Sequence, residues 1–209
     1  MKTKRKLLLL PAALLVVCAL LVSGIYVYLQ ICSWGFARSL PLTEQLQRME
    51  MVRTAETWLA TQEGSDRHAR IVEIYNSHKP LAQGYAVTTD DNWCAAFASA
   101  IAIQQRHTDI IPTECGCERQ IGLWQKLGRW EENDKYMPLP GDYIYYAWDE
   151  RFSFGDCTGW ADHVGIVVGT NGPFIKVIEG NRNDMVTYRV ILRGNWQIRG
   201  YGLPDYASK

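Results

Sequence analysis

Four side chains along this sequence have the types that a nucleophilic site requires: the thiol of Cys94, the imidazole of His163, and the polar groups of Glu179 and Asn181. An imidazole beside a thiol accepts its proton, and a third polar group that holds the imidazole completes an activated nucleophile. The residue types and their order therefore raise a hypothesis of thiol chemistry. It depends on whether the surrounding elements bring the four side chains together.

Cys94 stands at the start of an apolar stretch. Residues 95–103 are apolar on every side, which is typical of a helix buried in a domain interior. Asp90, Asp91 and Asn92 precede it and have the types that cap helix N-termini, which places Cys94 in the first turn. The helix dipole there lowers the pKa of a thiol, whereas the two carboxylates raise it. Taken alone, Cys94 is also consistent with a packed apolar cysteine, since free Cys is among the most buried residue types.

His163 opens a predicted strand directly after an irregular loop, so its side chain can project at the end of a sheet. The apolar segment 175–181 ends in Glu179 and Asn181, which share one face if the strand extends that far. We expect Glu179 to orient the imidazole, because a charge-assisted hydrogen bond stabilises imidazolium more strongly. Asn181 is then a supporting or substrate-facing group. The alternatives are a structural histidine and a polar strand end without chemistry.

Three further segments have the pattern of helices. Apolar residues recur at steps of three and four from residue 42 to about residue 59, which predicts an amphipathic helix that Gly64 ends. A second helix is predicted with Ser65 as its N-cap and an end before His78, and a third ends at Gly128. The apolar face of the first helix consists of Leu42, Leu46, Met49, Val52, Ala55 and Leu59.

After Trp130 the pattern changes from helical to β, with turn residues at 138–141. β-favouring residues then predict strands at 142–148, 163–169, 174–181, 185–191 and 198–201. Helices first and an antiparallel sheet second make an α+β domain.

The N-terminal segment predicts export. Residues 1–6 are basic, and residues 7–31 form an apolar run longer than the ~20 residues that span a bilayer as a helix. We expect a cytoplasmic tail, a single transmembrane anchor and everything after it outside the cell membrane. Cleavage near residues 22–24, as in a signal peptide, is the alternative and would give a secreted protein. Residues 32–64 are expected to be a linker and the amphipathic helix, followed by the catalytic domain at 65–209.

Composition excludes little but argues against nucleic acid as a partner. The 22 Lys and Arg residues balance 22 Asp and Glu residues, and no basic stripe interleaved with aromatics occurs. The 8 Trp and 11 Tyr residues suit a groove that stacks against sugar or peptide, although we expect most of them in the core.

Four segments resemble the CHAP family of cysteine, histidine-dependent amidohydrolases/peptidases, a papain-like group related to NlpC-type cell-wall hydrolases. They occur in the same order as in that family and cover roughly the last two thirds of the chain. In such proteins the cysteine is the nucleophile, the histidine is its base, and Glu and Asn orient the imidazole. These roles carry over onto Cys94, His163, Glu179 and Asn181. The segments are Trp93-Cys94-Ala95-Ala96-Phe97, Pro140-Gly141-Asp142, Asp162-His163-Val164-Gly165-Ile166-Val167 and Ile178-Glu179-Gly180-Asn181.

The resemblance implies a papain-like domain that hydrolyses an amide through a thioester and needs no metal or cofactor. Some relatives bind calcium, but Asp90 and Asp91 lack the spaced ligands of a calcium loop, so we expect no metal. We assign Trp93 and Asp162, the neighbours of the nucleophile and the base, to substrate binding.

An exported amidohydrolase of this kind is expected to cut peptidoglycan, as an N-acetylmuramoyl-L-alanine amidase or an endopeptidase. This would serve wall remodelling, or local opening of the wall for a secretion or conjugation apparatus. The competing hypothesis is a catalytically silent wall-binding or assembly module that keeps the fold.

Three further cysteines remain in the exported domain. Cys115 and Cys117 flank one glycine, and Cys157 lies in the loop before His163. We expect free thiols. A disulfide between Cys157 and one of the other two is an alternative in an exported domain, and a zinc site is a weaker one because it lacks an evident fourth ligand.

Overall fold

The computed structural model describes residues 40–133, 135–148 and 159–209. An antiparallel sheet has six strands in the spatial order β1, β6, β2, β3, β4, β5. With the helices beside it, the sheet makes the α+β domain that the sequence predicts. The two-residue strand at the edge of the sheet was not expected. The strands are β1 (Trp130–Glu131), β2 (Tyr143–Tyr146), β3 (His163–Asn171), β4 (Phe174–Glu179), β5 (Thr187–Leu192) and β6 (Ile198–Gly202).

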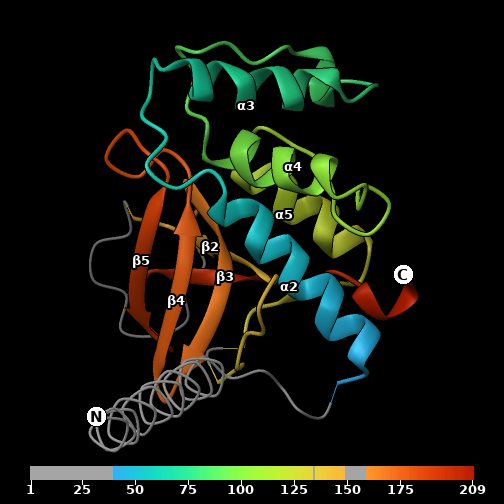
Figure 1. Ribbon diagram of the computed structural model, residues 1–209. Helices are drawn as coiled ribbons and strands as arrows, with labels where there is room; N and C mark the ends of the chain where they lie inside the picture. The colour runs from blue at the N-terminus through green and yellow to red at the C-terminus, as the bar shows by residue number, and fades with distance from the viewer. Residues whose placement is uncertain (1–39, 134, 149–158) are drawn as a thin grey trace, which may run out of the picture.

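The helices gather on one side of this sheet (Figure 1). They are α2 (Leu42–Glu56), α3 (Asp66–Ser77), α4 (Cys94–Gln104) and α5 (Cys117–Lys126), with short 3-10 turns η1 (Ala82–Gly84) and η2 (Tyr206–Ser208). Helix α4 packs against β3 and β4, and α3 covers the side of α4 that faces away from the sheet. Helix α4 is therefore the centre of the fold, enclosed on both sides.

The sequence of α4 explains this position. Every residue from Cys94 to Ala102 is buried, as its uniformly apolar composition predicts. The expected caps are wrong, because the N-cap residue is Trp93 and no side chain caps the helix. The carboxylate of Asp91 instead accepts hydrogen bonds from the backbone and hydroxyl of Thr88 and from the hydroxyl of Tyr85. Asp91 therefore orders the turn before the helix.

Helix α3 begins and ends as predicted. The Ser65 hydroxyl accepts a hydrogen bond from the backbone N–H of His68 at 3.2 Å, so Ser65 is the N-cap. The helix ends at Ser77, one residue before His78. Helix α5 also ends close to the predicted Gly128.

Helix α2 is present, and its predicted apolar face is buried only in part: Val52 and Ala55 are in the core, whereas the first turns of the helix differ. Leu42 and Leu46 are 69% and 51% exposed, whereas Glu44 and Arg48 are buried. The reason is an ion pair of Arg48 with Glu44, at 2.9 Å, and with Asp142 of the sheet, also at 2.9 Å. Buried charges require such partners, and this pairing accounts for the burial of Glu44 and Arg48 in the first half of the helix.

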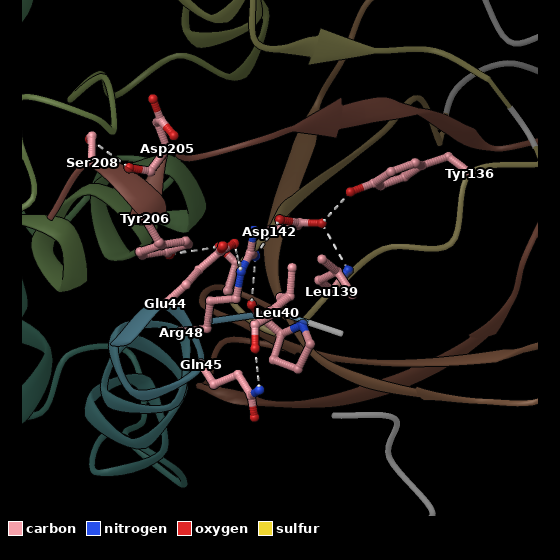
Figure 2. A network of polar contacts seen from close by, with 12 residues as sticks. Leu40, Glu44, Gln45, Arg48, Tyr136, Leu139, Asp142, Asp205, Tyr206 and Ser208 are labelled. Carbon is pink, nitrogen blue, oxygen red and sulfur yellow. Dashed lines mark hydrogen bonds and ion pairs between the residues drawn. The ribbon is translucent and has the colours of Figure 1, made fainter. Parts of the chain in front are cut away.

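A buried network holds α2 to the start of β2 (Figure 2). The fully buried carboxylate of Asp142 accepts hydrogen bonds from Arg48, from the Tyr136 hydroxyl at 2.7 Å and from the Leu139 backbone at 2.8 Å. Burial raises the pKa of the Asp142 carboxyl, and Arg48 and the other donors oppose this shift. The Pro-Gly-Asp segment is thus an anchor of the fold.

The C-terminal turn joins the same network. The Tyr206 hydroxyl donates to the backbone oxygen of Gly141 at 2.9 Å, and the Arg48 guanidinium lies 4.8 Å from the centre of the Tyr206 ring. Helix α2 also packs against α4 and β3. The domain boundary that we expected at residue 65 therefore falls inside one packed unit, and α2 belongs to the domain.

The predicted tail at 1–6, the anchor at 7–31 and the first part of the segment 32–64 lie outside the described residues. Within the described ranges, none of the helices has the length and apolar character needed to cross a membrane.

Candidate active site

Cys94 is the first residue of α4, and its side chain is almost completely buried. The first N–H groups of a helix have no partner inside the helix, and their partial positive charge favours an anion at this end. The position expected from the sequence is therefore the position found.

His163 is the first residue of β3 and pairs with Tyr146 of β2. The two rings stack at a centroid distance of 6.0 Å. The imidazole is buried, apart from a small exposed fraction, and its orientation is set by its contacts with neighbouring side chains.

Glu179 is the last residue of β4 and is fully buried. Its Oε2 lies 3.2 Å from Nε2 of His163. A Cβ atom at Gly165 would stand 2.8 Å from Cγ of Glu179, so the glycine leaves the space through which the carboxylate reaches the imidazole. The structure thus pairs His163 with Glu179, on adjacent strands.

The charges of these groups shift one another's pKa values. The pKa of the Cys94 thiol lies well below its usual value, chiefly because Cys117 hydrogen bonds to its sulfur, and also because His163 is beside it. Burial by itself would lower the pKa of His163, but its interactions with Cys94 and Glu179 raise it to about 9. The two shifts go in opposite directions, and together they favour a thiolate beside an imidazolium.

Burial opposes ionisation of Glu179, but hydrogen bonds from His163 and Arg189 and their charges lower its pKa. Because Nε2 of His163 faces Glu179, the nitrogen left for the thiol is Nδ1. The Glu179 carboxylate therefore orients the imidazole and, together with Cys94, favours its charged form.

Arg189 of β5 is a site residue that the sequence did not indicate. Its Nε donates to Oε1 of Glu179 at 2.6 Å, and its guanidinium lies 4.3 Å from the centre of the Trp148 ring. From sequence alone, an arginine in a strand is expected to face solvent. The register of β4 and β5, which pairs Glu179 with Thr187, is the signal that places Arg189 near the carboxylate.

Asn181 lies outside the strand. Strand β4 ends at Glu179, and Asn181 has a left-handed backbone with φ of 56°, so the two side chains do not share a strand face as we expected. A Cβ at Gly180 would stand 2.6 Å from Cβ of Phe97, so the chain turns where it passes close to α4. The Asn181 amide donates to Asn92 at 3.3 Å. Its catalytic role stays a prediction.

The two residues assigned to substrate binding lie in different surroundings. Trp93 is fully buried, donates its indole N–H to Glu63 at 3.0 Å and packs against the ring of His68. This contradicts a substrate-facing role, because the core encloses the whole side chain. Asp162 is exposed and accepts a hydrogen bond from the backbone of Trp148 at 2.9 Å, and its assignment stays a prediction.

A second thiol that the sequence did not place at the site lies beside the first. Cys117 is the first residue of α5, and its Sγ is 3.7 Å from Sγ of Cys94. Cys94, Cys115 and Cys117 are free thiols, and Cys157 lies outside the described residues. In the described part of the chain, no group of three or more His, Cys, Asp or Glu side chains is arranged to hold a metal ion.

Comparisons with known proteins add no family to this geometry. No protein-family model matches the chain, and no curated protein and no solved structure matches it either.

Proposed function

We propose that this protein is a thiol hydrolase that cleaves an amide bond, with Cys94 as nucleophile and His163 as its base. The observation that carries the proposal is the position of His163, which interacts with Cys94 on one side and hydrogen bonds to the carboxylate of Glu179 on the other. A thiol, an imidazole and an orienting group in this relation are the parts of a cysteine nucleophile.

The steps follow from these groups. The Cys94 thiolate attacks the amide carbon, and backbone N–H groups in the first turn of α4 hold the oxyanion that forms. His163 gives its proton to the leaving amine as the C–N bond breaks, which leaves a thioester on Cys94. His163 then takes a proton from water, and the resulting hydroxide releases the acid and restores the thiol site.

The substrate that we propose is peptidoglycan. The resemblance of the four segments to CHAP proteins supports a papain-like fold and an amidase or endopeptidase acting on the cell wall. The basic residues 1–6 and the apolar run 7–31 support an enzyme anchored in the cell membrane with its domain outside. Such an enzyme would remodel the wall or open it locally for a secretion or conjugation apparatus.

Turnover of purified peptidoglycan by the detergent-solubilised full-length chain tests this proposal. We expect soluble fragments to appear with the parent protein and not with Cys94→Ala. Mass spectrometry of the fragments distinguishes cleavage at the sugar–peptide amide from cleavage within the peptide. Sedimentation with peptidoglycan without any turnover would instead support a wall-binding module.

The proposed location has its own test. A tag placed after Lys209 should be accessible to protease in intact protoplasts and should remain with the membrane fraction. Recovery of the protein from the medium with a new N-terminus near Ile25 would show that the N-terminal segment is cleaved.

A further inference from the structure

The proposed hydrolysis uses one sulfur, that of Cys94. A second sulfur, that of Cys117, lies beside it. The two Sγ atoms lie 3.7 Å apart, and each cysteine opens a helix, α4 and α5 respectively. A disulfide has an S–S length of about 2.05 Å, so the sulfurs need to approach by about 1.7 Å. Rotation about the Cα–Cβ bond of either residue supplies a movement of this size.

We propose that Cys94 and Cys117 are a reversible oxidation site, in which a peroxide converts the two thiols into a disulfide that blocks the nucleophile. The inference rests on the proposed function in one respect only, which is that Cys94 is the nucleophilic thiol. It does not depend on the identity of the hydrolysed bond.

The two thiols have different roles in the reaction. Hydrogen bonding from Cys117 and the neighbouring His163 keep the pKa of Cys94 low, whereas the hydrogen bond to Cys94 and burial keep the pKa of Cys117 high. Cys94 is thus the thiolate that attacks an oxidant, and Cys117 remains protonated beside it as the resolving cysteine.

The reaction balances in two steps. The Cys94 thiolate attacks one oxygen of hydrogen peroxide, the O–O bond breaks, and with one proton the products are a sulfenic acid and water. The Cys117 sulfur then attacks the Cys94 sulfur, the S–O bond breaks, and hydroxide leaves with the proton of Cys117 as a second water. Two thiols are oxidised and one peroxide is reduced. A dithiol reverses the change by thiol–disulfide exchange.

The burial of the pair favours a small uncharged oxidant. Cys94 and Cys117 are 5% and 7% exposed, which leaves little room for a bulky disulfide such as oxidised glutathione to reach either sulfur. The disulfide would also protect Cys94 from further oxidation to the sulfinic acid, which ordinary dithiols do not reverse.

Cys115 supplies the matched control. It lies two residues before Cys117 and is a free thiol of intermediate exposure. Its sulfur neighbours are Glu114, at 3.5 Å, and Gln83, at 3.9 Å. Burial raises the pKa of Cys115, so its thiolate fraction at neutral pH is small.

Peptide mapping of the full-length chain after treatment with an excess of hydrogen peroxide over thiols tests the site, since one peroxide forms the sulfenic acid and a second is needed for the sulfinic acid. Trypsin without reductant should yield residues 71–106 linked to residues 107–119, and dithiothreitol should separate them. Cys117→Ser should lose this linked pair and accumulate the sulfinic acid on Cys94, whereas Cys115→Ser should keep the linked pair. Hydrolysis, where present, should fall in proportion to the disulfide and return with dithiothreitol.

Two results would overturn the proposal: sulfinic acid on Cys94 in the parent protein without any linked peptides, or loss of the link in Cys115→Ser but not in Cys117→Ser. Both readouts are independent of peptidoglycan. If linked peptides form in a protein that never hydrolyses peptidoglycan, the proposed oxidation site stands and the proposed function is wrong.

Discussion

Two buried charged clusters occupy different parts of this domain, and they differ in whether a proton can pass between their members. The Arg48 network consists of Glu44, Arg48, Tyr136 and Asp142, and the Cys94 site consists of Cys94, Cys117, His163 and Glu179. In the Arg48 network the guanidinium donates to both carboxylates, and the Asp142 carboxylate also accepts from Tyr136. Moving a proton there would leave a buried charge without its partner, which costs several kcal/mol.

In the Cys94 site the pKa values of the thiol and the imidazole shift in opposite directions. Cys94 is acidified and the pKa of His163 rises to about 9, so a proton moves from sulfur to nitrogen while both groups stay paired. Both clusters are buried and hydrogen bonded. The difference lies in proton exchange: the partners of the Arg48 network stay charged, whereas Cys94 and His163 are poised to exchange a proton.

The largest effect is expected from Cys94→Ala. Removal of the proposed nucleophile should lower kcat by a factor on the order of 10⁶, as removal of a nucleophile does in known catalytic triads, while the domain remains folded. Peptidoglycan turnover and circular dichroism measure the two properties, and His163→Ala should behave alike. If either variant digests peptidoglycan at the parental rate, the Cys94 site has no more chemical role than the Arg48 network.

Arg48→Met should lower the stability of the fold and leave the chemistry of the Cys94 site unchanged. Without the guanidinium, the carboxylates of Glu44 and Asp142 stay buried and unpaired, and the free energy of unfolding should fall by about 3–5 kcal/mol. Urea denaturation measures this change.

Arg53 on the same helix is the matched control, since its ion pair with Glu50 is exposed and Arg53→Met should leave the unfolding curve nearly unchanged. In the folded Arg48→Met protein, iodoacetamide should label Cys94 at the parental rate. A slower rate would mean that the two clusters are coupled.

Glu179→Gln should make the imidazolium form of His163 less stable without removing the imidazole itself. We expect kcat to fall roughly 10²-fold, because proton transfer by a positioned base contributes factors of this size or larger. In the parent, kcat/KM should rise as Cys94 ionises, below the usual thiol range, and should fall near pH 9 as His163 loses its proton.

Loss of the Glu179 charge lowers the pKa of His163, so the alkaline limb of the variant should move to lower pH. The pH profile of kcat/KM measures this. An alkaline limb that stays in place would show that Glu179 does not set the charge of the imidazole.

The smallest effect is expected from Asn181. Its amide contacts Asn92 rather than His163, so removal of the side chain should cost less than about tenfold in kcat/KM, partly through KM. Asn181→Gly is the suitable variant, since glycine accepts the positive φ of this position without strain. A loss as large as that of Cys94→Ala, with a mild Glu179→Gln, would exchange the roles of the two residues.

Much of the local structure could be predicted because it depends on neighbours along the chain. The N-cap at Ser65, the buried helix that begins at Cys94 and the strand that begins at His163 follow from short-range patterns. The burial of Glu44 and Arg48 on α2 could not be predicted in this way. Charged residues ordinarily face solvent, and the partner that buries Arg48 is Asp142, 94 residues further along the chain.

The sequence by itself determined the candidate groups and two of their positions: a thiol at the start of a helix and an imidazole at the start of a strand. It placed the carboxylate in a strand that it carried two residues too far. The sequence also favoured Glu179 over Asn181 as the partner of His163, and the structure has this contact. Only the tertiary structure decided that Asn181 leaves the strand face and that Cys117 lies against Cys94. These contacts join different elements. They depend on strand register and on close approaches such as that at Gly165, which no local pattern along the chain encodes.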